Sequence, residues 1–130
     1  MKIYISASFN SQKRLRHPAA KLRALGHTVL SSWLDEGAKP AYLDQPTWEG
    51  RLAFTDSAEI FASDCVILDR EGESTTGGRY VEWGMACAPG TVKLRITVGG
   101  GALRFFDHLA DFHFPDWDHL MDWFKSLEIK

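Results

Sequence analysis

Hydrophobic and polar positions follow two different periods along this chain. Runs of β-forming or continuously apolar residues predict five strands, at Lys2–Ser6, Thr28–Ser32, Cys65–Leu68, Val92–Val98 and Asp111–Phe114. Segments of helical character lie between and after them, at Ser11–Leu25, Thr47–Phe61, Tyr80–Ala88, Leu103–Leu109 and Asp116–Leu127. Strands that alternate with helices predict a three-layer α/β sandwich, in which helices cover both faces of a mostly parallel five-stranded sheet.

Breaker and capping residues set the expected ends of the first two helices. Pro18 suits a first helical turn, so we expect the first helix to begin near it and to end at Gly26. Thr47 is expected to cap the second helix. The apolar positions of that second helix are Leu52, Phe54, Ala58 and Phe61.

Composition narrows the class of protein. A length of 130 residues, with 45% hydrophobic and 25% charged residues, is typical of one soluble globular domain, here residues 1–130. Fifteen Lys and Arg against seventeen Asp and Glu give a net charge of −2, which argues against a nucleic-acid polymer as partner but permits a single phosphate. Cys65 and Cys87 are too few for a disulfide scaffold, and neither they nor the five histidines have metal-ligand spacing. Because the chain has no apolar stretch of membrane-spanning length and no signal-peptide pattern, we expect a cytoplasmic protein that does not bind membranes.

The expected sheet indicates where a ligand would bind. In open α/β sheets ligands bind beyond the carboxyl ends of the strands, at the point where the strand order reverses. This rule selects three loops, Ser6–Asn10, Trp33–Gln45 and Asp69–Gly78. Asp69, at the end of a buried strand, is therefore a candidate ligand contact.

The segment Ser74–Ala86 carries the most chemical information. It follows a buried strand and opens a helix, so its backbone N–H groups face an incoming ligand, and Gly77 and Gly78 let that ligand approach closely. Glu82 lies near the start of the same helix, where a carboxylate is stabilised as the anion that a nucleophile requires. The alternative role of Glu82 is that of a surface residue that helps to cap the helix.

An ordered set of residues along the chain resembles a known family. Its members here are Tyr4, Leu25–Val29, Asp56, Ser63–Leu68 and the pattern Gly78-x-x-x-Glu82-x-Gly84-x-Ala86. This set is similar to that of the nucleoside 2-deoxyribosyltransferases and the related 2′-deoxynucleoside 5′-phosphate N-hydrolases. The resemblance extends from Lys2 to about Val98, and weakly through Phe105–Trp117.

The resemblance implies a Rossmann-like, flavodoxin-like fold and a retaining cleavage of an N-glycosidic bond. Glu82 would attack the anomeric carbon to give a covalent glycosyl-enzyme, and water or a second base would then release the sugar. Asp56 matches the second catalytic carboxylate, which positions nucleophile and sugar and can protonate the base. Tyr4 matches the tyrosine that orients the nucleophile. The family needs no cofactor, and its pocket is completed by a neighbouring subunit, so a homo-oligomer is expected.

Candidate substrate-binding residues come from the three loops and from the resemblance. They are Ser6, Ser8, Trp33, Asp69, Thr76, Gly77, Gly78 and Arg79. Thr76 and Ser8 resemble serines that contact the 5′-phosphate in the hydrolases, and Arg79 could supply positive charge. Asn10 departs from the pattern, because those hydrolases carry an arginine there. Trp33 is placed to form a flat wall for a base, with core packing as the alternative.

Four functions remain open at this point. The threonine at position 76, where the transferases carry an aspartate, favours a monophosphate hydrolase over a nucleoside transferase. The other two are a non-catalytic nucleotide-binding module and an enzyme that cleaves the nicotinamide–ribose bond of NAD. In each case the partner is a small molecule, and no cofactor or metal is expected.

Overall fold

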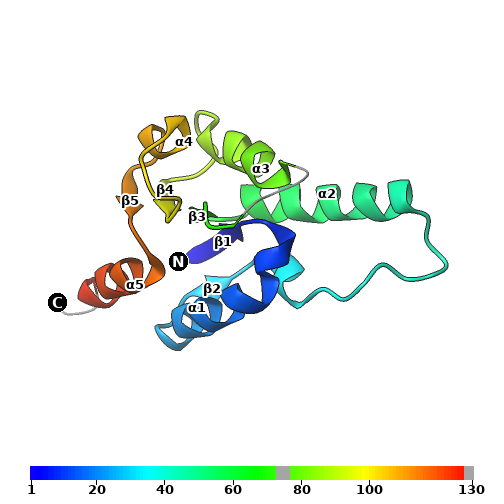
Figure 1. Cartoon of the computed structure of the whole chain (residues 1–130), viewed down its shortest axis with the longest axis horizontal. Coiled ribbons are helices and arrows are strands. Elements are labelled where there is room, and N and C mark those ends of the chain that lie inside the picture. Colours follow the sequence, from blue (N-terminus) through cyan, green and yellow to red (C-terminus); the bar gives the residue numbers. More distant parts are fainter. Residues whose placement is uncertain (73–76, 128–130) are drawn as a thin grey trace.

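A computed structural model describes residues 1–72 and 77–127 of the chain and places a five-stranded sheet at its centre (Figure 1). The strands are β1 (Lys2–Ser6), β2 (Thr28–Val29), β3 (Cys65–Asp69), β4 (Leu94–Val98) and β5 (Phe112–Phe114). Their order is β2-β1-β3-β4-β5, and each of the four pairings is parallel. After β1 the chain first adds β2 on one side of it and then β3 on the other side, so the strand order reverses at β1. The expected parallel sheet is confirmed.

Helices cover both faces of this sheet, as expected. They are α1 (Gln12–Ala24), α2 (Gln45–Phe61), α3 (Gly78–Cys87), α4 (Phe105–His108) and α5 (Trp117–Ser126). Figure 1 shows α1 and α5 on one face and α2, α3 and α4 on the other. Two short 3₁₀ turns, η1 (Phe9–Ser11) and η2 (Ser32–Asp35), follow β1 and β2 and lie beside the site described below. None of the helices in the described ranges has the length and apolarity needed to cross a membrane.

The two central strands form the middle of the core. All five residues of β3 are buried, which explains the continuous apolar run of this strand: both of its faces are covered. In β1 the residues Ile3, Tyr4 and Ile5 are fully buried, and Trp83 of α3 packs into the same core. The carboxyl ends of β1 and β3 are thereby held rigidly side by side, with Ser6 paired to Leu68.

The expected start of the first helix near Pro18 is wrong. Helix α1 begins at Gln12, and Pro18 lies in its interior. A proline there removes one helical hydrogen bond and costs about 3 kcal/mol. Pro18 is buried on the face that also carries Leu15, Ala19 and Leu22, and the burial of this apolar face offsets that cost.

Helix α2 also differs from its expected form. Its N-cap is Asp44, whose carboxylate accepts a hydrogen bond from the backbone N–H of Thr47 at 2.8 Å, so the helix begins before Thr47. Pro46 occupies the first turn, where its missing N–H has no cost. Only Ile60 of this helix is buried, and Figure 1 shows α2 extending beyond the sheet. Phe54 and Phe61 are accordingly exposed, at 78% and 59%.

Candidate active site

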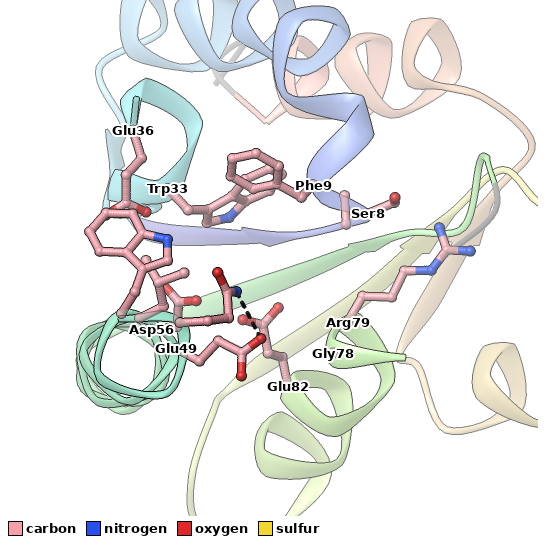
Figure 2. Close-up of a pocket in the computed structure, with 13 residues that line it drawn as sticks. Ser8, Phe9, Trp33, Glu36, Glu49, Asp56, Gly78, Arg79 and Glu82 are labelled. Atoms are coloured by element: carbon pink, nitrogen blue, oxygen red, sulfur yellow. Dashed lines mark hydrogen bonds between the residues drawn. The ribbon is translucent and has the colours of Figure 1, made fainter. Parts of the chain in front are cut away.

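A cavity of about 610 Å³ opens at the carboxyl end of β1, at the reversal point of the sheet. Its walls come from the segments that follow β1 and β2, from one face of α2 and from the first turns of α3 (Figure 2). Its apolar wall consists of Phe9, Trp33, Trp48 and Leu52. Its acidic lining consists of Glu36, Glu49, Asp56 and Glu82. A cavity of this size with aromatic walls and convergent polar groups is typical of a small-molecule site.

Two hydroxyl groups of β1 hold the carboxylate of Glu82. The Tyr4 hydroxyl donates to Oε2 at 2.7 Å, and the Ser6 hydroxyl donates to Oε1 at 2.7 Å. Tyr4 and Ser6 lie two positions apart, so their side chains leave the strand on the same face. Each carboxylate oxygen thus has one donor from a rigid central strand, which fixes the orientation of Glu82 toward the cavity.

Asp56 lies across from Glu82 on α2, and the two carboxyl groups titrate as a pair. Burial and the negative charges of Glu82, Glu59 and Glu36 raise the pKa of Asp56 to about 7. Burial also raises the pKa of Glu82, against the opposing effect of hydrogen bonds from Ser6, Tyr4 and Asp56. Because the hydroxyl donors favour the charged form of Glu82, we assign the shared proton to Asp56.

Tyr4 itself remains neutral. Burial, followed by the charges of Glu82 and Asp56, raises the pKa of its phenol above the ordinary value. A neutral phenol is a hydrogen-bond donor, which is the role its 2.7 Å contact with Glu82 requires. The arrangement pairs an ionised carboxylate with a protonated one, the combination that separates nucleophile from acid in carboxylate chemistry.

Trp33 serves both the core and the cavity. It is only 5% exposed, and its indole N–H donates to the carbonyl oxygen of Ile5 at 2.8 Å. The ring also lines the cavity, and the ring of Phe9 lies beside it at a centroid distance of 6.3 Å. The two roles weighed for Trp33 in the sequence are therefore compatible in the structure.

Arg79 lines the cavity, but its guanidinium is committed to the backbone. Nη1 donates to the carbonyl oxygens of Asp69 and Glu71 at 3.1 and 2.8 Å, and Nη2 donates to that of Gly72 at 2.7 Å. These bonds fix the start of the β3–α3 connection. In Figure 2 the side chain points away from Glu82 toward this connection.

Of the remaining residues predicted to bind substrate, some line the cavity and others do not. Ser8 and Gly78 line the cavity, and Gly77 caps α3 with a left-handed φ of 69°, a conformation that favours glycine. Thr76 lies outside the described residues. Asp69 does not line the cavity, because its wholly buried carboxylate is turned to other partners.

Those partners of Asp69 give it a structural role. Arg14 donates to both of its carboxylate oxygens at 2.9 and 3.0 Å, and the indole N–H of Trp117 donates at 2.6 Å. The carboxylate also accepts from the backbone N–H of Glu71 at 2.9 Å. Asp69 therefore ties α1, the β3–α3 connection and α5 together.

Several lining residues were not selected from the sequence. They are Ala7, Phe9, Glu36, Gln45, Trp48, Glu49 and Leu52. Positions 45, 48, 49, 52 and 56 recur at spacings of three and four, which places them on one face of α2, so Asp56 could have identified its neighbours. Phe9 and Glu36 lie in two of the loops that the reversal rule selected. Among the described residues, no group of three or more His, Cys, Asp or Glu side chains is arranged to hold a metal ion.

Fold and cavity together define an α/β protein with a carboxylate pair at the reversal point of a parallel sheet. No protein-family model matches the sequence, and no curated protein sequence matches it either. Among solved structures, a 2-deoxyribosyltransferase from the psychrotolerant bacterium Bacillus psychrosaccharolyticus is similar with a TM-score of 0.72 at 21% identity, over 94% of this chain and 91% of that chain.

Two further solved structures are similar over nearly their whole length. A conserved protein from Enterococcus faecalis V583 has a TM-score of 0.67 at 16% identity, over 98% of each chain. The CMP N-glycosidase BcmB of Clostridium botulinum has a TM-score of 0.58 at 14% identity, over 99% of this chain and 100% of that chain. The chain therefore has the fold of this transferase and this glycosidase, which confirms the expected Rossmann-like architecture.

Proposed function

We propose that this protein belongs to the nucleoside 2-deoxyribosyltransferase family and cleaves the N-glycosidic bond of a nucleoside or nucleotide, with Glu82 as nucleophile. The observation that carries the proposal is the pairing of Glu82, held by Tyr4 and Ser6, with the higher-pKa carboxyl of Asp56 at one cavity. The shared fold with a 2-deoxyribosyltransferase and a CMP N-glycosidase supports it.

The proposed reaction has two displacement steps. In the first, an oxygen of the Glu82 carboxylate forms a bond to the anomeric carbon while the bond from that carbon to the base breaks. The bonding electron pair leaves with the base nitrogen, and Asp56 supplies the proton that neutralises the base. In the second step water, or the nitrogen of another base, attacks the same carbon, releases the Glu82 carboxylate and returns a proton to Asp56.

Preorganisation of the nucleophile supplies much of the expected rate. Glu82 extends from α3, and both of its oxygens are held by donors from the neighbouring strand. Little orientational freedom is therefore lost when the substrate reacts. The two donors also keep Glu82 ionised beside Asp56, because they favour its charged form.

We propose a nucleoside 5′-monophosphate as the substrate and hydrolysis as the outcome. Ser8 and Gly78 line the cavity where α3 begins, and the N-terminus of a helix suits a phosphate. The acidic lining favours a second candidate, base exchange between uncharged nucleosides. Glu36, Glu49 and the ionised Glu82 repel a phosphate, and the Nη groups of Arg79 are bound to carbonyl oxygens.

Base release separates these candidates. The protein is incubated with deoxynucleosides and their 5′-monophosphates, with and without a free acceptor base, and the products are separated by chromatography. Release from monophosphates without an acceptor supports hydrolysis, whereas exchange that requires an acceptor supports transfer. A 2-fluoro sugar analogue should leave a covalent adduct on Glu82 that is absent from Glu82→Gln. Intact substrates and no adduct would leave only a nucleotide-binding module.

We also propose that the protein is a homo-oligomer in which a second copy covers α2 and α3. Phe54, Phe61 and Val81 are 78%, 59% and 62% exposed on these helices. A second cavity of about 250 Å³ lies between the helices and reaches Asp56 and Glu82 from their outer side. A copy seated there would bury the exposed apolar side chains and close this second entrance to the carboxylate pair.

A further inference from the structure

The main cavity presents carboxylate hydrogen-bond acceptors from two walls, Glu36 after η2 and Glu49 on α2. We propose that Glu36 and Glu49 select a base that presents an amino group there, as adenine and cytosine do, over one that presents a carbonyl oxygen. This inference rests on the proposed function, because it takes the sugar to be bound at Asp56 and Glu82. It adds the class of base and the residues that choose it.

The geometry of α2 directs the base toward these residues. Asp56, Leu52, Glu49 and Gln45 lie on one face of the helix, and Figure 2, viewed along its axis, shows Glu49 and Asp56 on the same side. Seven residues separate Glu49 from Asp56, which is about 10 Å along the axis at 1.5 Å per residue. If the sugar is bound at Asp56, the distance from Asp56 to Glu49 is long enough to hold a base. That base would lie beside the apolar wall of the cavity.

The two carboxylates of this lining accept hydrogen bonds. The Gln45 side-chain amide donates one of its two N–H groups to one oxygen of Glu49 at 3.1 Å, which leaves the other oxygen of that carboxylate for a ligand. Glu36 extends from the segment after η2 toward α2 (Figure 2), and none of the described residues donates a hydrogen bond to its carboxylate. Glu36 is half-buried, and burial with the charge of Glu59 raises its pKa above the ordinary value. An amino group of a ligand would therefore donate a hydrogen bond that none of the described residues makes to this carboxylate.

The edges of the bases differ in what they offer to such acceptors. Cytosine and adenine carry an exocyclic amino group, which donates two hydrogen bonds, whereas uracil, thymine and hypoxanthine carry a carbonyl oxygen in its place. A carbonyl oxygen facing Glu36 or Glu49 would meet a like partial charge and would donate no hydrogen bond to either carboxylate. One matched contact of this kind discriminates by about 10-fold to 100-fold.

Two pairs of substrates test the inference, because the members of each differ at this one position. They are deoxycytidine against deoxyuridine, and deoxyadenosine against deoxyinosine, each with and without a 5′-phosphate. The ratio of kcat/KM for base release within each pair should favour the amino member at least about 10-fold. Glu36→Gln and Glu49→Gln should reduce this ratio, since an amide adds a donor that a carbonyl oxygen accepts. Asp35→Asn is the matched control: it removes a charge next to Glu36 from an exposed residue that does not line the cavity, and the ratio should not change.

The outcomes separate this inference from the proposed chemistry. Equal rates within both pairs, a preference for the carbonyl member, or an amino preference that neither glutamine variant alters would each overturn the inference while cleavage stands. If no base is released from any substrate, the cleavage proposal fails, and binding decides the inference. The dissociation constants of the same pairs for Glu82→Gln, measured by calorimetry, should then favour the amino member, and equal constants would overturn it.

Discussion

At the scale of single residues, a small number of hydrogen bonds fixes the position of the Glu82 carboxylate. Its two oxygens have one hydroxyl donor each, from Tyr4 and Ser6, and its neighbour Asp56 is the group that carries a proton near neutral pH. Each of these contacts can be removed with little change in side-chain volume. Their contributions to the proposed reaction can therefore be measured one at a time.

Tyr4→Phe removes the donor to Oε2 and keeps the buried ring. A hydrogen bond to a charged group contributes about 1.5–3 kcal/mol, so we expect kcat to fall about 10-fold to 100-fold with little change in KM. Steady-state base release by the variant measures this. Tyr80→Phe is the control, because Tyr80 stacks on Phe106 outside the cavity and should keep full activity. A Tyr4→Phe enzyme with unchanged kcat would contradict a positioning role for the phenol.

The pKa of Asp56 sets the expected pH dependence of the reaction. Asp56 must hold a proton to protonate the departing base, and its pKa of about 7 places the alkaline fall in kcat/KM near that pH. Glu82 must be ionised, so protonation of the pair at acid pH gives the opposite limb. A bell-shaped profile of kcat/KM against pH is the expected result. A rate that stays level from pH 6 to about pH 9 would exclude Asp56 as the acid.

The same pKa makes a prediction for stability. The pKa of Asp56 rises from 3.8 to about 7 on folding, so the folded chain binds this proton more tightly than the unfolded chain. The resulting stabilisation is complete below about pH 4 and is lost as the pH rises through 7. Asp56→Asn carries no charge to lose, and should be more stable than the wild type by about 1–2 kcal/mol at pH 8, a value reduced for the partial exposure of the group. Urea unfolding at pH 5 and pH 8 measures the difference, which should be smaller at pH 5.

At the scale of elements, the β3–α3 connection is held from two sides. Arg79 binds the carbonyl group of the last residue of β3 and two carbonyl groups of the connection, and Asp69 joins the connection to α1 and α5 through Arg14 and Trp117. Because α3 carries Glu82, these contacts place the nucleophile relative to β1. Neither Asp69 nor the guanidinium group of Arg79 contacts Glu82.

Asp69→Asn should therefore act on stability and only indirectly on catalysis. It removes the charge from a buried carboxylate that accepts from Arg14, Trp117 and the Glu71 backbone, and places an NH₂ group against these donors. We expect a loss of about 2–4 kcal/mol in the free energy of unfolding, measured by urea denaturation. Asp35→Asn, at an exposed position, should be within about 0.5 kcal/mol of the wild type. An Asp69→Asn protein of unchanged stability would refute the structural role.

The elements that the sequence pattern predicts well are those whose local signals agree with their packing. The apolar run Cys65–Leu68 predicts a buried central strand, and Asp116–Leu127 predicts α5 almost to the residue. Pro18 misleads because the buried face of α1 outweighs a local preference of proline. In the site, Glu82, Asp56 and Tyr4 could be proposed from the family resemblance of the sequence, but the partners of Asp69 and Arg79 could not. Those contacts depend on where α1, α5 and the β3–α3 connection meet in space.

At the scale of the whole molecule, α2 has two different faces. One lines the cavity with Gln45, Glu49 and Asp56, and the other exposes Phe54 and Phe61. Exposed aromatic side chains two turns apart on one helix face cost free energy in water unless another surface covers them. The second cavity, between α2 and α3, connects this outer surface to the carboxylate pair.

Phe54→Glu tests whether a second copy covers this surface. If the proposed homo-oligomer is correct, the wild type should sediment as a dimer or a larger assembly, and the variant should sediment as a monomer, because a charge would be buried at the contact. Base release should fall with dissociation, since the outer entrance to Asp56 and Glu82 would then admit water. Phe105→Glu is the control: Phe105 is 73% exposed on α4, and its replacement should leave both assembly and activity unchanged. A wild-type chain that is monomeric and active at every concentration would refute the assembly and leave the single-chain cavity as the complete site.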